Sequence, residues 1–381
     1  MPQSLRLLGR RGRKRPFWQR HRFLLTELIL AMLSLALWVA STRSPAFALG
    51  LSQSLGAWIR TGLGWLTGWI PFCLAELLLF GLVLFLLAWL IALIVGLVRA
   101  IRKRPKSPGL RRFLLSPLCL TLALLILFAC AFGPCYHCPS LASQMNLEQE
   151  VNPDKLFFAL DVLIDTVNAQ VPQLSFVKAQ AQNPLGFEGV ARELNAQYDR
   201  FCANHSFLQP TGFVAKPVLL SHYMTYTHIS GVYAFFTGES AINTNYPPYL
   251  LPYTVAHEYA HQRGVAPENE ANFLAFVLCM QSEIPFLRYS GAANVFGAVA
   301  NAAYDTDPQR YLSAIARLDP ALSGEYRAYK EFFKPYENSP AADLSQAAND
   351  AYLKGNGQAQ GTLSYSLITS LVTNYLWQQA Q

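Results

Sequence analysis

Charged side chains are scarce in this sequence of 381 residues: Asp, Glu, Lys and Arg make up 14% of it, against 52% hydrophobic residues. Soluble globular domains carry about 25% charged residues, so the composition argues against a wholly soluble protein and places part of the chain in a membrane. Acidic residues are scarcest in the first third, where residues 1–133 hold 2 of the 23 in the chain. The chain therefore divides into an apolar, basic part and a more ordinary part.

The net charge of +7 does not describe the chain as a whole. Residues 1–22 carry eight Lys and Arg and no acid, whereas residues 134–381 carry 13 basic against 21 acidic residues, a formal charge of −8. The sequence also lacks any recognised nucleic-acid-binding motif. We therefore expect no nucleic-acid partner and assign the basic residues to segments that flank a membrane.

Three long apolar runs predict membrane-spanning helices at about 23–40, 71–98 and 113–132, because each approaches the roughly 20 residues that a bilayer requires. A cleavable signal peptide is the alternative for the first run. That run is longer than a signal core, however, and Ser41–Ser44 is a poor cleavage site. Glu76 lies near one end of the second run, where a charged side chain either reaches the lipid headgroups or serves a function.

Lys and Arg also predict the orientation, because short loops rich in these residues stay on the cytoplasmic side. The segment 99–112 carries seven basic residues, whereas the connection between the first two spans holds only Arg43 and Arg60. The N-terminus and the second connection should therefore be cytoplasmic. The expected division is a basic cytoplasmic tail (1–22), a membrane domain (23–133) and an extracytoplasmic domain (134–381).

The segment 47–70, between the first two spans, is amphipathic and contains Trp58, Trp65 and Trp69. Tryptophan settles at the depth of the lipid headgroups. We expect this segment to lie along the outer membrane surface as an interfacial helix, with an irregular loop as the alternative.

Residues 134–381 are numerous enough for one globular core. Their apolar periodicity predicts helices at 156–169, 189–202, 270–281, 292–304, 309–318, 324–333, 341–352 and 362–378. Residues 231–236 and 241–245 suit short strands around a turn. The predicted fold class is α+β, dominated by helices, with a small sheet before the helix that carries the main motif.

That motif is H-E-x-x-H, formed by His257, Glu258 and His261 on a stretch with helical character. Residues four apart share one helix face, so the two imidazoles can bind a single zinc ion while the carboxyl group projects toward a metal-bound water. Glu258 would then act as the general base of a hydrolase. The alternative is that both histidines pack without a metal.

A third ligand lies within reach in the segment Glu268-Asn-Glu270-Ala-Asn272, which opens the next apolar helix. Glu268 is the favoured ligand, since Asn272 then lies one helical turn further on and can hold His257 by a hydrogen bond. Glu270 is the alternative ligand. Both acids also suit a helix N-terminus that binds no metal.

These motifs resemble a domain-of-unknown-function family of bacterial membrane proteins that have a few N-terminal spans and an H-E-x-x-H domain. The E-x-E-A-N element is similar to the third-ligand helix of gluzincin metallopeptidases, in which the first Glu binds zinc and several members have Asp in place of Asn272. The resemblance implies a zincin-like fold and names no substrate, and Cys135–Cys138 departs from it. It rests on Ser230–Gly231, Tyr233, Phe236–Glu239, Asn243, Pro252, His257–Gly264, Glu268–Phe273 and Arg288–Gly291.

In related metallopeptidases a strand before the motif helix pairs with an extended substrate, and 241–245 is the candidate here; completing the sheet is the alternative. Tyr289 and Tyr365 are candidates to stabilise an oxyanion, although tyrosines more often pack. His222 and His228 are more typical of loop or core histidines than of ligands.

The chain has seven cysteines, three of which fall in the apolar runs. Any disulfide should therefore involve the four others, and the C-x-x-C pair can also be two free thiols. These four are Cys135, Cys138, Cys202 and Cys279.

The leading interpretation is a zinc metallopeptidase, anchored in a bacterial cell membrane, that hydrolyses protein or peptide substrates at the outer face. One alternative is a noncatalytic membrane scaffold with a structural zinc site. The other is an amidase that acts on cell-wall peptides. Glu258 favours catalysis, because a structural zinc site is closed and needs no general base.

Overall fold

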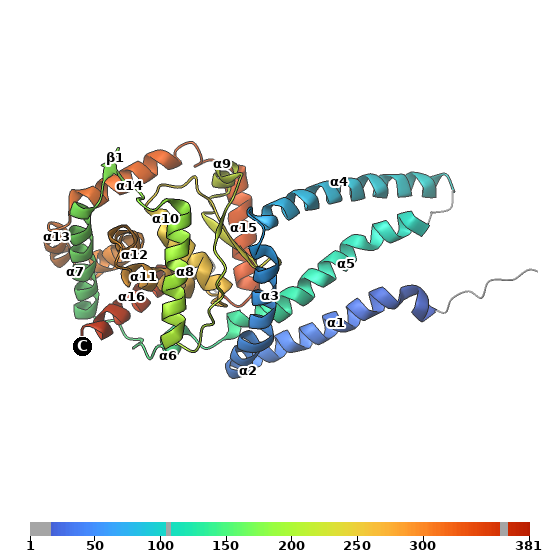
Figure 1. The fold of residues 1–381 in the computed structure, drawn as a ribbon, viewed down its shortest axis with the longest axis horizontal. Helices are drawn as coiled ribbons and strands as arrows, with labels where there is room; N and C mark the ends of the chain where they lie inside the picture. The colour runs from blue at the N-terminus through green and yellow to red at the C-terminus, as the bar shows by residue number, and fades with distance from the viewer. Residues whose placement is uncertain (1–16, 104–107, 359–364) are drawn as a thin grey trace, which may run out of the picture.

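The computed structural model describes residues 17–103, 108–358 and 365–381, and within these it leaves out the side chains of 17–23, 108, 111–112 and 365–366. Residues 1–16 of the expected tail therefore lie outside the described residues. Figure 1 shows three long helices leaving one side of a mostly helical body, with the C-terminus at the body's opposite end.

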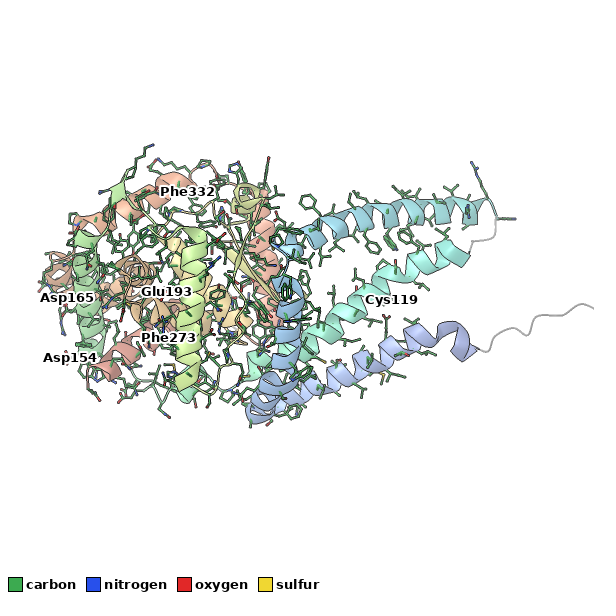
Figure 2. All side chains as sticks on the ribbon, in the orientation of Figure 1. Cys119, Asp154, Asp165, Glu193, Phe273 and Phe332 are labelled. Carbon is green, nitrogen blue, oxygen red and sulfur yellow. The ribbon has the colours of Figure 1, made fainter. Side chains whose placement is uncertain are left out.

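The three long helices are α1 (Phe17–Arg43), α4 (Leu74–Ile101) and α5 (Pro108–Ala131). Their segments Leu24–Arg43, Leu74–Ile101 and Phe113–Ala131 are long and apolar enough to cross a membrane. In α4 only Ala75 and Gly96 are buried, and apolar side chains project from all three helices without protein covering them (Figure 2). Surfaces of this kind are typical of segments that contact lipid. The three predicted spans coincide with the three candidate spans.

The body is built from helices whose ends differ by a few residues from the predicted ones. Short 3-10 turns separate some of them, including η2 (Gly133–His137) and η4 (Thr225–Thr227). The helices are α6 (Leu141–Gln144), α7 (Pro153–Gln170), α8 (Gly186–Asn204), α9 (Ser221–Met224), α10 (Leu250–Gln262), α11 (Glu268–Met280), α12 (Pro285–Thr306), α13 (Pro308–Ile315), α14 (Pro320–Phe333), α15 (Pro340–Gly355) and α16 (Tyr365–Gln379).

Helix α11 lies at the centre of the core. Every residue from Phe273 to Cys279 is 0% exposed, as expected of a helix that is apolar on all sides. It packs against α10, α12, α16 and α8, while α7 packs against α12 and α16. Its acidic first turn therefore projects from a rigid core helix, which positions Glu268 and Glu270.

A three-stranded sheet lies beside α10, with the strand order β3, β5, β4. Strand β4 (Gly231–Ala234) pairs antiparallel with β5 (Glu239–Ile242), and β3 (Lys216–Pro217) pairs parallel with β5 on its other side. A separate two-stranded hairpin joins β1 (Phe176–Val177) to β2 (Gln180–Ala181). The predominantly helical fold with small sheets agrees with the predicted class.

The segment between the first two spans is helical, as expected, and consists of α2 (Pro45–Leu51), a π-helical turn η1 (Ser52–Gly56) and α3 (Ala57–Gly68). Trp58 and Trp65 on α3 are 83% and 59% exposed, and the opposite face buries Gly64. A Cβ at Gly238, whose φ is +74°, would lie 2.8 Å from the Gly64 nitrogen. The inner face of α3 therefore packs tightly on the turn between β4 and β5.

Two carboxylates fix the start of α4 to the body. Glu239 on β5 accepts hydrogen bonds from the backbone N–H groups of Leu74 and Ala75 and pairs with Lys216 at 2.7 Å. Glu76, in the first turn of α4, accepts from the N–H groups of residues 219 and 220 at 2.9 and 2.8 Å. Glu76, the charged residue near one end of the second span, therefore holds α4 against the body.

Candidate metal centre

Helix α10 presents the H-E-x-x-H motif on a well-packed scaffold. Val255, Ala256 and Ala260 are 0% exposed, which fixes the rotation of the helix about its axis. The two histidines, four residues apart, therefore emerge on one face. Glu258 emerges on an adjacent face, toward β4.

The donor atoms of His257, His261 and Glu268 converge. The two Nε2 atoms lie 3.0 Å apart, and the carboxylate oxygens of Glu268 lie 3.2 Å from Nε2 of His257 and 3.6 Å from Nε2 of His261. These three residues can each offer one ligand atom with all atoms within 4.8 Å of one another. Glu270 instead accepts a hydrogen bond from the N–H of Leu141 at 2.9 Å, so the geometry groups Glu268 with the histidines.

Hydrogen bonds to the far side of each imidazole orient the lone pairs. Nδ1 of His257 lies 2.9 Å from Oδ1 of Asn272, and Nδ1 of His261 lies 2.7 Å from the carbonyl oxygen of Val265. Both partners are acceptors, so each neutral ring carries its proton on Nδ1 and its lone pair on Nε2. Two nitrogen lone pairs and a carboxylate then face one another with no donor among them. This donor set fits a metal cation, with the acceptors behind the rings in the supporting role typical of metal-binding histidines.

The electrostatics of this group favour positive charge. Burial, the largest single influence, lowers the pKa of His261, but the charge and hydrogen bond of Glu268, the charge of Glu258 and the Val265 carbonyl together outweigh it and raise that pKa to about 9. Burial likewise opposes ionisation of Glu268, yet the two histidines hold the pKa of this carboxyl group well below its usual range. The same field that draws a proton to the site attracts a metal cation.

Glu258 lies beside the group and is 4% exposed. Burial raises the pKa of its carboxyl group above the usual range. Among the described residues no hydrogen-bond partner reaches its Oε2 atom. A Cβ at Gly231 would lie 2.7 Å from both Cγ and Oε1 of Glu258, so a glycine is required for β4 to pass this close. The result is a buried carboxyl group with one oxygen free for chemistry.

The segment 241–245, predicted to pair with a substrate, contributes to a central strand that has no unpaired edge, as in the alternative that it completes the sheet. Residues 239–242 form β5, the central strand, which already pairs with β3 and β4. In the described part of the chain β3 and β4 are the two edge strands of this sheet, and β4 is the edge strand that contacts Glu258.

The tyrosines proposed from the sequence do not join the site. Tyr289 is fully buried and donates to Glu325 at 3.4 Å, and the side chain of Tyr365 lies outside the described residues. Two other tyrosines lie closer, Tyr136 on η2 and Tyr352 on α15, with ring centroids 5.9 Å apart. Burial raises the pKa of Tyr352 to about 12, with a further contribution from Glu268. Their positions 216 residues apart in the chain left no pattern to predict them.

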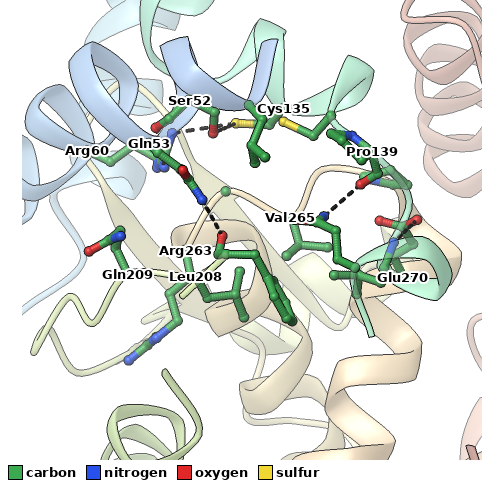
Figure 3. Close-up of a pocket in the computed structure, with 17 residues that line it drawn as sticks. Ser52, Gln53, Arg60, Cys135, Pro139, Leu208, Gln209, Arg263, Val265 and Glu270 are labelled. Atoms are coloured by element: carbon green, nitrogen blue, oxygen red, sulfur yellow. Dashed lines mark hydrogen bonds between the residues drawn. The ribbon is translucent and has the colours of Figure 1, made fainter. Parts of the chain in front are cut away.

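The remaining histidines and cysteines lie outside the metal-binding group. His228 contacts the carbonyl oxygen of Tyr336 at 2.9 Å, and His222 is exposed. All seven cysteines are free thiols. In the C-x-x-C pair, the thiol of Cys135 lies 3.1 Å from the Ser52 hydroxyl (Figure 3), and no disulfide joins it to Cys138.

The fold and the site together define a chain with three candidate membrane spans and a His-His-Glu group able to hold a metal. Residues 51–373 match a family described as a protein of unknown function, DUF3810, and the chain belongs to this family. No curated protein and no solved structure matches the chain. The expected membership in a domain-of-unknown-function family is confirmed, and membership assigns no activity.

Proposed function

We propose that the protein is a membrane-anchored zinc metallopeptidase that hydrolyses peptide bonds at the outer face of the membrane. The convergence of His257, His261 and Glu268 within 4.8 Å, beside the buried carboxyl group of Glu258, supports this proposal. Two imidazoles and one carboxylate are the ligand set of open, catalytic zinc sites. A zinc ion held there would supply Lewis-acid chemistry, polarising a carbonyl group and making water acidic.

The chain's own residues have separate roles in this reaction. Oε2 of Glu258 accepts a proton from the attacking water and later donates it to the leaving amine nitrogen. The raised pKa of this carboxyl group helps it hold the proton between these steps. The outer edge of β4, at the Gly231 end of the strand, binds the substrate backbone as an added strand. Gly231 brings that edge into contact with Glu258, so the bound peptide bond lies next to the base.

A structural zinc site fits these residues less well. Such sites are closed by four protein ligands, and the described residues bring no fourth His, Cys, Asp or Glu into the group. A structural site also makes no use of a buried, unpartnered carboxyl group. An amidase of cell-wall peptides would use the same chemistry, so the substrate panel should include such peptides.

The experiment is hydrolysis by the full-length protein in lipid nanodiscs, assayed against a peptide library that includes cell-wall peptides. We expect cleavage by the zinc-loaded protein, loss of cleavage after chelation and recovery when zinc is restored. A zinc-loaded protein that cleaves no peptide and binds no hydroxamate would argue for the scaffold instead.

We also propose that the body faces away from the cytoplasm. The basic residues of 1–22 and 99–112 support this orientation, and α1, α4 and α5 all meet the body at the same side (Figure 1). Protease added to intact spheroplasts should therefore digest the body. Digestion that begins only after the membrane is lysed would reverse the orientation.

A further inference from the structure

We infer that this enzyme cleaves membrane-anchored polypeptides within a few residues of their anchor. The inference rests on the proposed peptidase function and adds a substrate class and a cleavage position. Three features of the structure carry it: the distance of the metal-binding group from the third span, the hydrogen bonds of Arg60 that fix this distance, and the direction of β4.

The metal-binding group lies at the membrane end of the body. The third candidate span ends at Ala131, and the next residue, Phe132, has its ring centroid 6.2 Å from that of His261. A metal ligand therefore contacts the residue that directly follows a membrane-spanning segment. Since one aromatic ring separates them, the group lies close to the level at which α5 leaves the bilayer.

A buried arginine fixes this arrangement. Arg60 of α3 is 4% exposed and donates to the carbonyl oxygens of Ala131 at 2.7 Å and Ser52 at 3.1 Å. A Cβ at Gly264, two residues after α10, would lie 2.7 Å from Nη2 of the same side chain. One guanidinium group thus joins α3, the end of α5 and the end of the metal-binding helix. Figure 3 shows Arg60 beside Ser52 and Cys135. The body therefore cannot lift the site away from the membrane without breaking buried hydrogen bonds.

Strand β4 leads from the spans to the base. Gly231, the first residue of the strand, contacts Glu258. Phe235 directly follows the last residue of the strand, and its ring centroid lies 5.4 Å from that of Phe128 on α5. Four residues of extended strand cover about 13 Å. A substrate chain that extends from the span in the direction of β4 therefore reaches Glu258 after about four to six residues, and the cleaved bond should lie at that distance from the membrane anchor.

Exposed apolar side chains lie on the body near the ends of the spans that join it. Trp58, in the first turn of α3, is 83% exposed, and Trp69, shortly before α4, is 79% exposed. Leu219 and Tyr223 are 75% and 66% exposed where Glu76 holds the adjacent loop. Aromatic side chains of this kind settle in the headgroup region. We expect these residues to lie in the lipid surface, which leaves little room for a folded soluble substrate on that side.

The test uses three randomised peptide libraries, in vesicles of phosphatidylethanolamine and phosphatidylglycerol that contain the full-length zinc-loaded protein. The first carries a dipalmitoyl anchor directly next to about ten random residues. The second has the same anchor but a spacer of about 20 Gly and Ser residues before the random segment, and the third has no anchor. Mass spectrometry locates the cleaved bonds. The two anchored libraries have the same surface concentration, so they differ only in distance from the membrane.

We expect cleavage about four to six residues from the anchor, with the random segment of the first library cut about tenfold or more faster than that of the other two. The Glu258→Gln protein should cut none of them, which excludes a contaminating protease. Equal cleavage of the random segment in the first and second libraries would overturn the inference while leaving the peptidase function intact. Absence of cleavage in all three libraries would overturn the peptidase function itself, and the inference with it.

Discussion

Glu258→Gln should lower kcat for peptide hydrolysis about 100- to 10,000-fold, the usual contribution of general acid–base catalysis. The amide has the shape of the carboxyl group but cannot accept the proton from water. Zinc should stay bound, because Glu258 lies outside the group formed by His257, His261 and Glu268. The fold should also persist, since burial disfavours the charge of the carboxylate and the amide of the same shape carries none.

The matched control is Glu283→Gln, the same chemical change at an exposed residue between α11 and α12. It should leave both kcat and zinc content unchanged. Elemental analysis and peptide cleavage on the same preparations check both expectations. Full activity in the Glu258→Gln protein would exclude this residue as the base.

His261→Ala should reduce the zinc content from about one ion per chain to near zero, because a catalytic site has only three protein ligands and loses one of them. Glu268→Gln should weaken zinc binding for the same reason. Glu270→Gln should retain zinc, since its carboxylate binds the Leu141 N–H instead. His222→Ala, which removes an exposed histidine, is the control for loss of an imidazole.

Elemental analysis after dialysis against weakly chelating buffer measures these differences. Full zinc occupancy in both the His257→Ala and the His261→Ala proteins would show that zinc binds elsewhere. Loss of zinc from Glu270→Gln combined with retention in Glu268→Gln would transfer the third-ligand role to Glu270.

Local patterns account for what the sequence predicted well. The spacing of His257 and His261 requires only the geometry of one helix, and α10 provides it. The three candidate spans follow from long apolar runs, which also depend on neighbouring residues alone. Glu268 could be ranked above Glu270 because Asn272 then lies one helical turn further on α11, where it contacts His257 at 2.9 Å.

Contacts between distant segments account for what the sequence could not predict. Strand β5 becomes central only because β3, two residues long, pairs with it, and no periodicity marks so short a strand. No local pattern predicts the role of Glu239 either, because its partners are the backbone N–H groups at the start of α4, far away in the sequence. In the sequence Arg60 is one of two basic residues between the first two spans, and only its hydrogen bond to Ala131 shows that it joins the span to the site.

The central claim is that His257, His261 and Glu268 form an open, catalytic zinc centre. Zinc X-ray absorption spectra of the zinc-loaded full-length protein, recorded without and with a hydroxamate, test it most directly. We predict a first shell of nitrogen and oxygen that contains two imidazoles and no sulfur, and that changes when the hydroxamate takes the open position. A shell that contains sulfur, for instance from Cys135 and Cys138, or a spectrum that the hydroxamate leaves unchanged, would contradict the account.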